Sequence, residues 1–101
     1  MSYRIYATET FKTLYHSLET DEQIWIDKIK KNLEEYPTGK ILKYKWFREK
    51  RYGNKRLYYL LNDENKKILL VSFASKKEQQ KIIDFITLNM KELLSYLKNL
   101  N

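Results

Sequence analysis

One short stretch of the sequence, residues 40–56, concentrates the side chains that could bind or process a polyanion. It holds eight basic residues and a single acid, Glu49, whereas the segments before and after it carry net charges close to zero. Clustered cations repel one another in the free protein, and they displace counterions from a phosphate backbone when they bind it. The stretch therefore predicts a nucleic-acid surface built from Lys40, Lys43, Lys45, Arg48, Lys50, Arg51, Lys55 and Arg56.

Aromatic residues are interleaved with these cations, among them Tyr44, Trp46, Tyr52 and Tyr58. An aromatic ring beside a cation suits unpaired bases, because stacking on the ring contributes about 1 to 3 kcal/mol per base while Lys or Arg holds the phosphate. The alternative is that the rings are core residues on alternating strands below an ordinary lysine-rich surface. Both interpretations stay open at this point.

The same stretch predicts a β-hairpin. Residues 45–52 and 55–62 have the composition of strands, and Gly53-Asn54 between them tolerates the positive φ of a tight turn. Because successive side chains of a strand point to opposite faces, Phe47, Glu49 and Arg51 should share one face of the hairpin, and Arg48, Lys50 and Tyr52 the other. We nevertheless expect the cations of the hairpin to form one accessible surface.

The remaining sequence predicts an α+β domain with the order β-α-α-β-β-β-α(α). Strands are expected at residues 3–7 and 67–74, and the second of these is apolar on both faces, as in a strand buried in a sheet. Thr8 should cap a first helix, Asp21 a second that ends at residues 37–39, and a capping box from Ser75 to Glu78 a third that bends near residues 87–89. The small, mostly antiparallel sheet should pack against the N-terminal helical hairpin and the C-terminal helix.

Composition narrows the chemistry. A chain of 101 residues suits one domain, residues 1–101, and the absence of cysteine together with a single histidine argues against thiol chemistry and Cys/His zinc sites. Gly39 and Gly53 lie in no phosphate-binding loop pattern. We expect no cofactor and no metal. No apolar run is long enough to cross a bilayer, so a cytoplasmic location without a membrane partner is expected.

Length, charge and element order together resemble the RelE/ParE superfamily of toxins from prokaryotic toxin–antitoxin pairs. The segment Arg51-Tyr52-Gly53-Asn54-Lys55-Arg56-Leu57-Tyr58-Tyr59 is similar to the family's central hairpin. Residues 68–73, followed by Ala74-Ser75-Lys76-Lys77, are similar to its last strand and the basic residues after it. The resemblance covers almost the whole chain, although each motif is short.

The resemblance implies one of two activities, each neutralised by a cognate antitoxin protein. RelE-like members are ribosome-dependent mRNA endoribonucleases, and ParE-like members are non-hydrolytic toxins that bind DNA gyrase. We favour the first, with mRNA and the ribosome as partners, and keep the second as an alternative. A catalytically inactive, basic RNA-binding module is a further alternative. The antitoxin is expected to dock a helical segment on the apolar surface of the first two helices or of residues 82–100.

The resemblance also suggests roles for particular residues. Metal-free RNA cleavage uses the 2′-hydroxyl as nucleophile and needs a base, cations around the phosphorane and an acid at the leaving oxygen. Arg56, Arg51 and Lys77 are the candidates for polarising the phosphate, and Glu49 is the candidate base. Neighbouring cations weaken a carboxylate as a base, so an ordinary ion pair of Glu49 with Lys55 or Arg56 is the alternative. The candidates for binding RNA around this centre are Arg48, Lys50, Lys55, Lys76, Lys45 and Tyr58.

Two features depart from the family pattern. With Arg51 and Arg56 aligned, the positions at which RelE nucleases carry two lysines fall on Phe47 and Glu49. The tyrosine or histidine that many of them carry in the last helix falls near Ile82 or Ile83. Both departures bear on catalysis rather than on RNA binding.

Overall fold

Five strands form one sheet in the order β1-β5-β4-β3-β2 in the computed structural model, which describes residues 2–100. The strands are β1 (Arg4–Ala7), β2 (Lys40–Ile41), β3 (Phe47–Tyr52), β4 (Lys55–Asn62) and β5 (Lys67–Ser75). β1 runs parallel to β5, and every other neighbouring pair is antiparallel. The mostly antiparallel sheet predicted from the sequence is confirmed.

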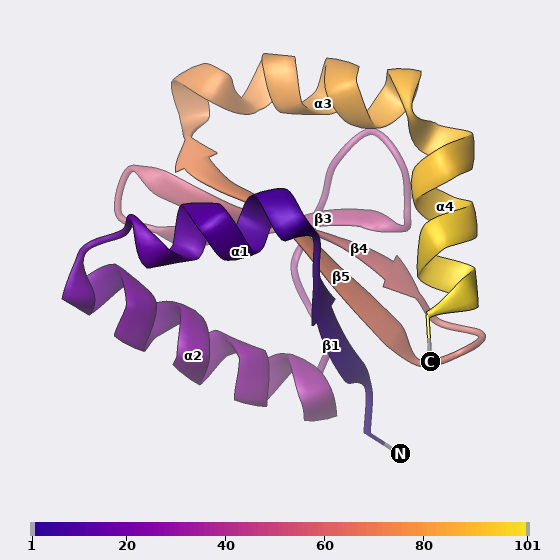
Figure 1. Cartoon of the computed structure of the whole chain (residues 1–101), viewed down its shortest axis with the longest axis horizontal. Helices are drawn as coiled ribbons and strands as arrows, with labels where there is room; N and C mark the ends of the chain where they lie inside the picture. Colours follow the sequence, from indigo (N-terminus) through magenta and orange to yellow (C-terminus); the bar gives the residue numbers. More distant parts are fainter. Residues whose placement is uncertain (1, 101) are drawn as a thin grey trace.

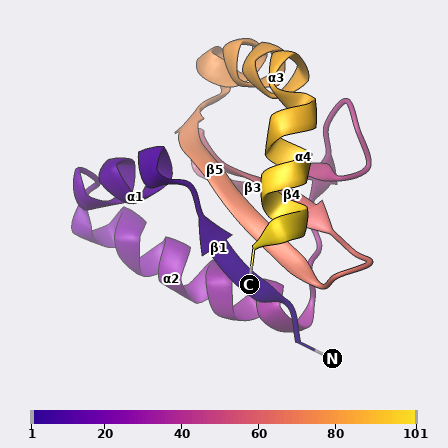
Figure 2. The same cartoon turned by 45° about the vertical axis from the view of Figure 1, so that its right-hand side comes forward.

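Helices cover both faces of this sheet (Figures 1 and 2). α1 (Glu9–His16) and α2 (Thr20–Glu35) form a hairpin on one face, and α3 (Gln79–Leu88) and α4 (Met90–Asn99) lie on the other. A 3-10 turn, η1 (Lys76–Glu78), joins β5 to α3. The α+β class and the order of elements are confirmed. None of the helices within residues 2–100 is long and apolar enough to cross a membrane.

β4 and β5 carry the core because both of their faces are covered. In β4, Leu57 and Tyr59 pack toward α1 and α2, whereas Tyr58 and Leu60 pack toward α3 and α4, and all four side chains are fully buried. In β5, buried apolar side chains likewise point to both sides, as its composition predicts. A bulge between Tyr58 and Tyr59 shifts the pairing of β4 with β5 and lies next to the residues considered below.

The N-termini of the helices agree with one of the three capping predictions. Thr8 caps α1 as expected, because its Oγ1 accepts a hydrogen bond of 3.0 Å from the Phe11 backbone N–H. The prediction for Asp21 was wrong: the helix is capped two residues earlier, by a capping box between Glu19 and Glu22. The capping box predicted from Ser75 to Glu78 was also wrong, because the tighter 3-10 turn follows Ser75 and its side chain makes no capping hydrogen bond.

The bend predicted near residues 87–89 is confirmed, because α3 ends at Leu88 and α4 begins at Met90. Asn89 joins the two helices with non-helical dihedrals, and its side-chain amide donates a hydrogen bond of 2.9 Å to the Phe85 carbonyl. The side chain thus satisfies one of the carbonyls that the end of a helix leaves free.

The short strand β2 was not predicted from the sequence. It extends the sheet beyond β3 by pairing Lys40 with Glu49 and Ile41 with Arg48. Gly39 permits this close approach: a β-carbon there would overlap the Tyr59 hydroxyl and lie 2.9 Å from the Glu49 carbonyl oxygen. The Tyr59 hydroxyl itself donates to the Thr38 carbonyl. Gly39 and Tyr59 therefore fix β2 beside Glu49.

Replacing Gly39 with Ala should lower the free energy of unfolding by about 1 to 3 kcal/mol, because the added methyl group has no room against Tyr59 and the β3 backbone. Gly53→Asn is the matched control, since nothing lies within 4 Å of a β-carbon at Gly53 and asparagine tolerates its positive φ. Urea denaturation measures both. Equal stability of Gly39→Ala and wild type would contradict the close packing of β2.

Candidate nucleic-acid interface

The cations of the β3–β4 hairpin lie on both faces of the sheet. Arg51 pairs in register with Arg56, and both share the α3–α4 side with Glu49. Arg48, Lys50 and Lys55 point to the opposite side, as the alternation predicts. The expectation that all of these cations form one accessible surface was therefore wrong.

The cations on the α1–α2 side are used within the protein. Lys55 Nζ lies 2.6 Å from Glu22 Oε2 and connects β4 to α2. Arg48 donates hydrogen bonds to the Pro37 and Lys45 carbonyls, at 3.0 and 3.1 Å. Lys55 therefore stabilises the packing of β4 on α2, and Arg48 stabilises the two segments that flank β2.

A cationic hollow of about 380 Å³ nevertheless opens around Glu49. Its lining comes from β2, β3, β4 and η1, and it contains five cations and one carboxylate: Gly39, Lys40, Glu49, Lys50, Arg51, Arg56 and Lys76. Lys50 reaches it from the edge of the sheet, where its Nζ also donates to Thr38 Oγ1 at 2.8 Å. Lys50 thus joins Arg51 and Arg56 at this hollow, although its side chain starts on the other face of the sheet. We refer to it as the cationic hollow.

The turn of the hairpin holds the two arginines of this hollow. Arg51 Nε donates to the Gly53 carbonyl at 3.2 Å, and Arg56 Nη1 donates to the Asn54 carbonyl at 3.3 Å. Like charges directly opposite each other on paired strands are destabilising. An anion placed between the two guanidiniums would relieve this repulsion and would be held by rigid, forked donors.

Glu49 and Arg56 are both buried, with 7% and 8% of their surfaces exposed. Arg56 Nε lies 3.8 Å from Glu49 Oε2, which makes an ion pair but is longer than a charge-assisted hydrogen bond. The same carboxylate oxygen accepts a hydrogen bond of 2.7 Å from Gln79 Nε2 at the start of α3. The ion pair with Arg56 is thus the alternative that the sequence left open for Glu49.

Tyr58, expected to contact RNA, is fully buried directly opposite Glu49 in the sheet. Its hydroxyl has no hydrogen-bond partner of acceptable geometry among the described residues, although the Gln79 side chain lies beside it. Burial raises the pKa of Tyr58, and the charge of Glu49 raises it further, while Arg56 and Gln79 act in the opposite direction. Tyr58 therefore belongs to the core beside Glu49 and presents no surface for stacking.

The basic residues outside the hairpin differ in their placement. Lys76 lines the hollow, whereas Lys77 and Lys45 are exposed and do not line it. In α3, Ile82 and Ile83 are partly buried and pack on the core cluster beneath α3 and α4. Among residues 2–100, no group of three or more His, Asp or Glu side chains is arranged to hold a metal.

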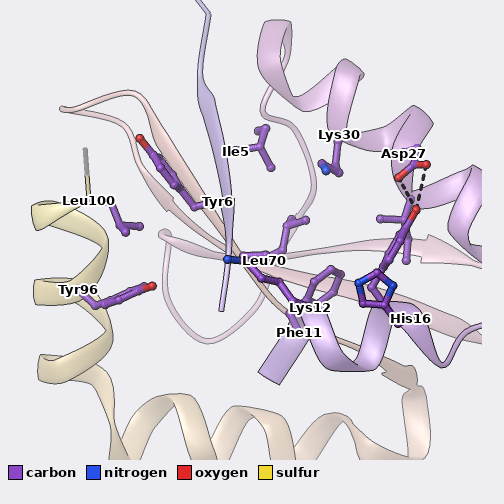
Figure 3. Close-up of a pocket in the computed structure, with 13 residues that line it drawn as sticks. Ile5, Tyr6, Phe11, Lys12, His16, Asp27, Lys30, Leu70, Tyr96 and Leu100 are labelled. Atoms are coloured by element: carbon purple, nitrogen blue, oxygen red, sulfur yellow. Dashed lines mark hydrogen bonds between the residues drawn. The ribbon is translucent and has the colours of Figure 1, made fainter. Parts of the chain in front are cut away.

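A second hollow, of about 460 Å³, lies between α1, α4 and the free edge of β1 (Figure 3). Tyr96 of α4 and Leu100, which follows that helix, line it from one side, and Phe11 of α1 and Lys30 of α2 line it from another, with β1 between them. The lining contains none of the cations of residues 40–56. We call it the β1 groove, and its wall combines apolar side chains with the charged side chains of Lys12, Asp27 and Lys30, which suits a protein segment.

No protein-family model matches the chain, and no curated protein matches it significantly. Solved structures do match. The E. coli toxin RelE in the free state, a variant with two arginines replaced by alanine, superposes with a TM-score of 0.70 at 16% identity over 79% of this chain and 90% of that chain. The toxin–antitoxin complex RelBE2 of Mycobacterium tuberculosis gives a TM-score of 0.65 at 21% identity, over 75% and 100%. The archaeal RelE–RelB complex of Pyrococcus horikoshii OT3 gives 0.65 at 19% identity, over 75% and 97%.

The chain has the fold of the RelE toxins. TM-scores of 0.65 to 0.70 establish the shared fold, and identities of 16 to 21% establish nothing beyond it, so the activity has to be argued from the residues of the cationic hollow. The three structures named here are of RelE, and the ParE-like alternative gains no support from them.

Two residues at the cationic hollow, Gly39 and Gln79, were not predicted from the sequence as site residues, and the pairing of Lys40 with Glu49 was not predicted either. Gly39 and Lys40 read as a turn, because a two-residue strand leaves no periodic pattern to detect. Gln79 lies one residue beyond the predicted capping box, where a polar helix residue is ordinary. Only the packing of α3 against β3 shows that its amide reaches Glu49.

The stability of the fold should fall as the pH rises from about 10 to about 12. Burial raises the pKa of Tyr59 from 10.0 to about 12. The unfolded chain therefore loses this proton at a lower pH than the folded chain, and the free energy of unfolding decreases through that window. Tyr59→Phe should flatten the pH dependence while losing about 1 kcal/mol for the hydrogen bond to Thr38.

Urea denaturation at a series of alkaline pH values measures this effect. Tyr36→Phe is the control, because it removes the hydroxyl of a tyrosine whose side chain is 73% exposed. An unchanged slope in Tyr59→Phe would contradict the assignment to Tyr59.

Proposed function

We propose that the chain is the toxin of a toxin–antitoxin pair and that it acts as a ribosome-dependent mRNA endoribonuclease. The observation that carries the proposal is the register of Arg51 opposite Arg56, at a hollow that holds five cations around a single carboxylate. The RelE fold supports it, because the matching structures are toxins of that name. A single-stranded phosphate backbone supplies the anion that this arrangement lacks.

The proposed reaction is transfer within the RNA strand and uses the groups of the hollow. Glu49 takes the proton of a 2′-hydroxyl, whose oxygen attacks the adjacent phosphorus. A 2′,3′-cyclic phosphate forms, and the bond to the 5′ oxygen of the next nucleotide breaks. Arg51 and Arg56 stabilise the charge of the phosphorane, because guanidinium forks match its equatorial oxygens.

The leaving 5′ oxygen must receive a proton in the same reaction. Arginine does not release its proton near neutral pH, so among the residues that line the hollow a lysine ammonium is the suitable donor. Lys76 is the better choice than Lys50, because Lys50 Nζ already donates to Thr38. We therefore place Lys76, rather than Lys77, in the reaction.

The inactive RNA-binding module remains a second candidate for a specific reason. Glu49 is buried and accepts from Gln79, and α3 offers Ile82 and Ile83 where the family carries a polar residue. In that case RNA would bind at the hollow without being cut. Incubation of the purified chain with translating ribosomes, followed by primer extension on the message, separates the two functions.

Replacing the exposed Arg51 with Ala should reduce cleavage of translated mRNA by about tenfold or more, because one of the two phosphate ligands is lost. Lys76→Ala should act in the same direction. Lys77→Ala is the matched control, since Lys77 is the neighbouring exposed lysine and does not line the hollow. Arg56 is a less suitable first target, because its removal would leave a buried carboxylate without its cation and cost stability.

Cleaved messages are measured by primer extension, and the melting transition of each variant is recorded beside it. Cleavage that is equally reduced by Lys77→Ala and Lys76→Ala would remove the hollow as the site. Intact mRNA accompanied by double-strand DNA breaks would contradict the proposed ribonuclease and indicate a toxin that binds gyrase.

We further propose that the β1 groove receives a segment of the cognate antitoxin. Several of the matching structures are complexes of RelE with RelB. The exposed apolar side chains Phe85 and Tyr96 border the groove and a smaller hollow that continues it along α3 and α4. Both docking surfaces expected from the sequence, that of the first two helices and that of residues 82–100, contribute to this one groove.

Tyr96→Asp should weaken binding of the antitoxin by about tenfold to a hundredfold, because it places a charge in an apolar contact. Tyr36→Asp is the control, as Tyr36 is an exposed tyrosine outside the groove. Calorimetry with the protein encoded by the adjoining reading frame measures the affinities. Equal affinity of Tyr96→Asp and wild type would move the docking site elsewhere.

A further inference from the structure

Gln79 connects α3 to Glu49, the carboxylate that lines the cationic hollow. It is the first residue of α3 and directly follows the 3-10 turn that carries Lys76. Its amide Nε2 donates a hydrogen bond of 2.7 Å to Glu49 Oε2. The contact joins residues that are thirty positions apart in the sequence, so it depends on how α3 packs against β3.

The same oxygen of Glu49 is the one nearest to Arg56. Arg56 Nε lies 3.8 Å from Oε2, about 1 Å beyond a charge-assisted hydrogen bond. The amide of Gln79 therefore donates to the same oxygen that a closely paired guanidinium would approach. Arg56 instead donates from Nη1 to the Asn54 carbonyl, at 3.3 Å.

We infer that Gln79 is a positioning residue that keeps Glu49 and Arg56 from closing into a tight ion pair. The inference rests on the proposed function, because it assigns Arg56 to the phosphate and Glu49 to the 2′-hydroxyl. An amide is neutral, so it satisfies a buried carboxylate oxygen without cancelling the charge of Arg56. The guanidinium remains available for an incoming phosphate, and the carboxylate remains available as a base.

Loss of this amide should bring Arg56 and Glu49 closer together. Without Gln79, a buried oxygen of Glu49 has no hydrogen-bond donor, and Arg56 is the cation closest to it. Closure by about 1 Å would satisfy both groups, since charge-assisted pairs form at about 2.7 to 2.9 Å. The hollow would then lose one of its two phosphate ligands and its base together, while the fold is kept.

Gln79→Leu tests this inference in the full chain, made by cell-free synthesis with 15N-labelled arginine. The Nε–H signal of Arg56, assigned with Arg56→Lys, is followed by NMR during titration with inorganic phosphate at low ionic strength. Wild type should show a shift of this signal on phosphate binding. Gln79→Leu should show slower exchange of the Nε–H proton and an affinity for phosphate at Arg56 weaker by about tenfold.

Gln80→Leu is the matched control. Gln80 is the next residue of α3, is exposed, and donates to Asp84 at 2.9 Å on the solvent side of the helix. It should behave as wild type. The double variant Gln79→Leu with Glu49→Gln should recover phosphate binding at Arg56, because the neutral side chain at position 49 no longer holds the guanidinium. A role for Gln79 in packing alone would not produce this recovery.

Wild-type affinity of Gln79→Leu for phosphate, or failure of the double variant to recover it, would overturn the inference. The outcome is separable from that of the proposed function, which is measured by cleavage of translated mRNA. A wild-type chain that cuts no message but shows the loss and the recovery would refute the ribonuclease and support the role of Gln79. A chain that cuts messages equally well with Gln79→Leu, and with unchanged phosphate binding, would refute only the role of Gln79.

Discussion

The pairing of Arg51 with Arg56 across β3 and β4 is the constraint on which the rest of the structure depends. Two guanidiniums directly opposite each other are unfavourable, so the register that imposes this contact must be secured elsewhere. The secure part is β4, whose side chains are buried in two apolar clusters, one on each face. A slip of the register by one residue would move the β4 side chains of each cluster to the opposite face of the sheet. The packing lost in that exchange keeps the two arginines opposite each other.

The charged side chains of the hollow differ in their burial. Arg56 and Glu49 lie below the surface as a loose pair, while Arg51, Lys40 and Lys76 remain at the rim of the hollow. A buried charge is tolerated only when it has partners. Glu49 has the amide of Gln79, Arg56 has the Asn54 carbonyl, and the two charges lie 3.8 Å apart. The cationic character that remains is open to solvent, which is the condition for binding a phosphate.

Much of the fold could be predicted because it depends on local patterns. The alternation of β3 placed Glu49 and Arg51 on one face, and the double-sided apolar pattern of β5 identified a buried strand. Residues whose roles depend on tertiary contacts could not be predicted in this way. Gln79 reaches Glu49 only through the packing of α3, and Tyr58, an apparent stacking residue among cations, is covered by the helices above it. The cations were expected on one surface because sequence proximity was given more weight than strand alternation.

The departures from the RelE pattern follow from the same core. Phe47 is fully buried beneath α3 and α4, next to the ring of Tyr58, and Ile82 and Ile83 pack on the same cluster. A lysine at Phe47 or a polar group at Ile82 would have to enter this apolar cluster, so these positions contribute to stability in this chain. Any chemistry is left to the groups that the cluster supports from below: one carboxylate, two arginines and a lysine at the rim. In the proposed reaction this reduced set divides two tasks: the carboxylate held by the amide of Gln79 is the base, and the loosely paired guanidinium of Arg56 is a phosphate ligand.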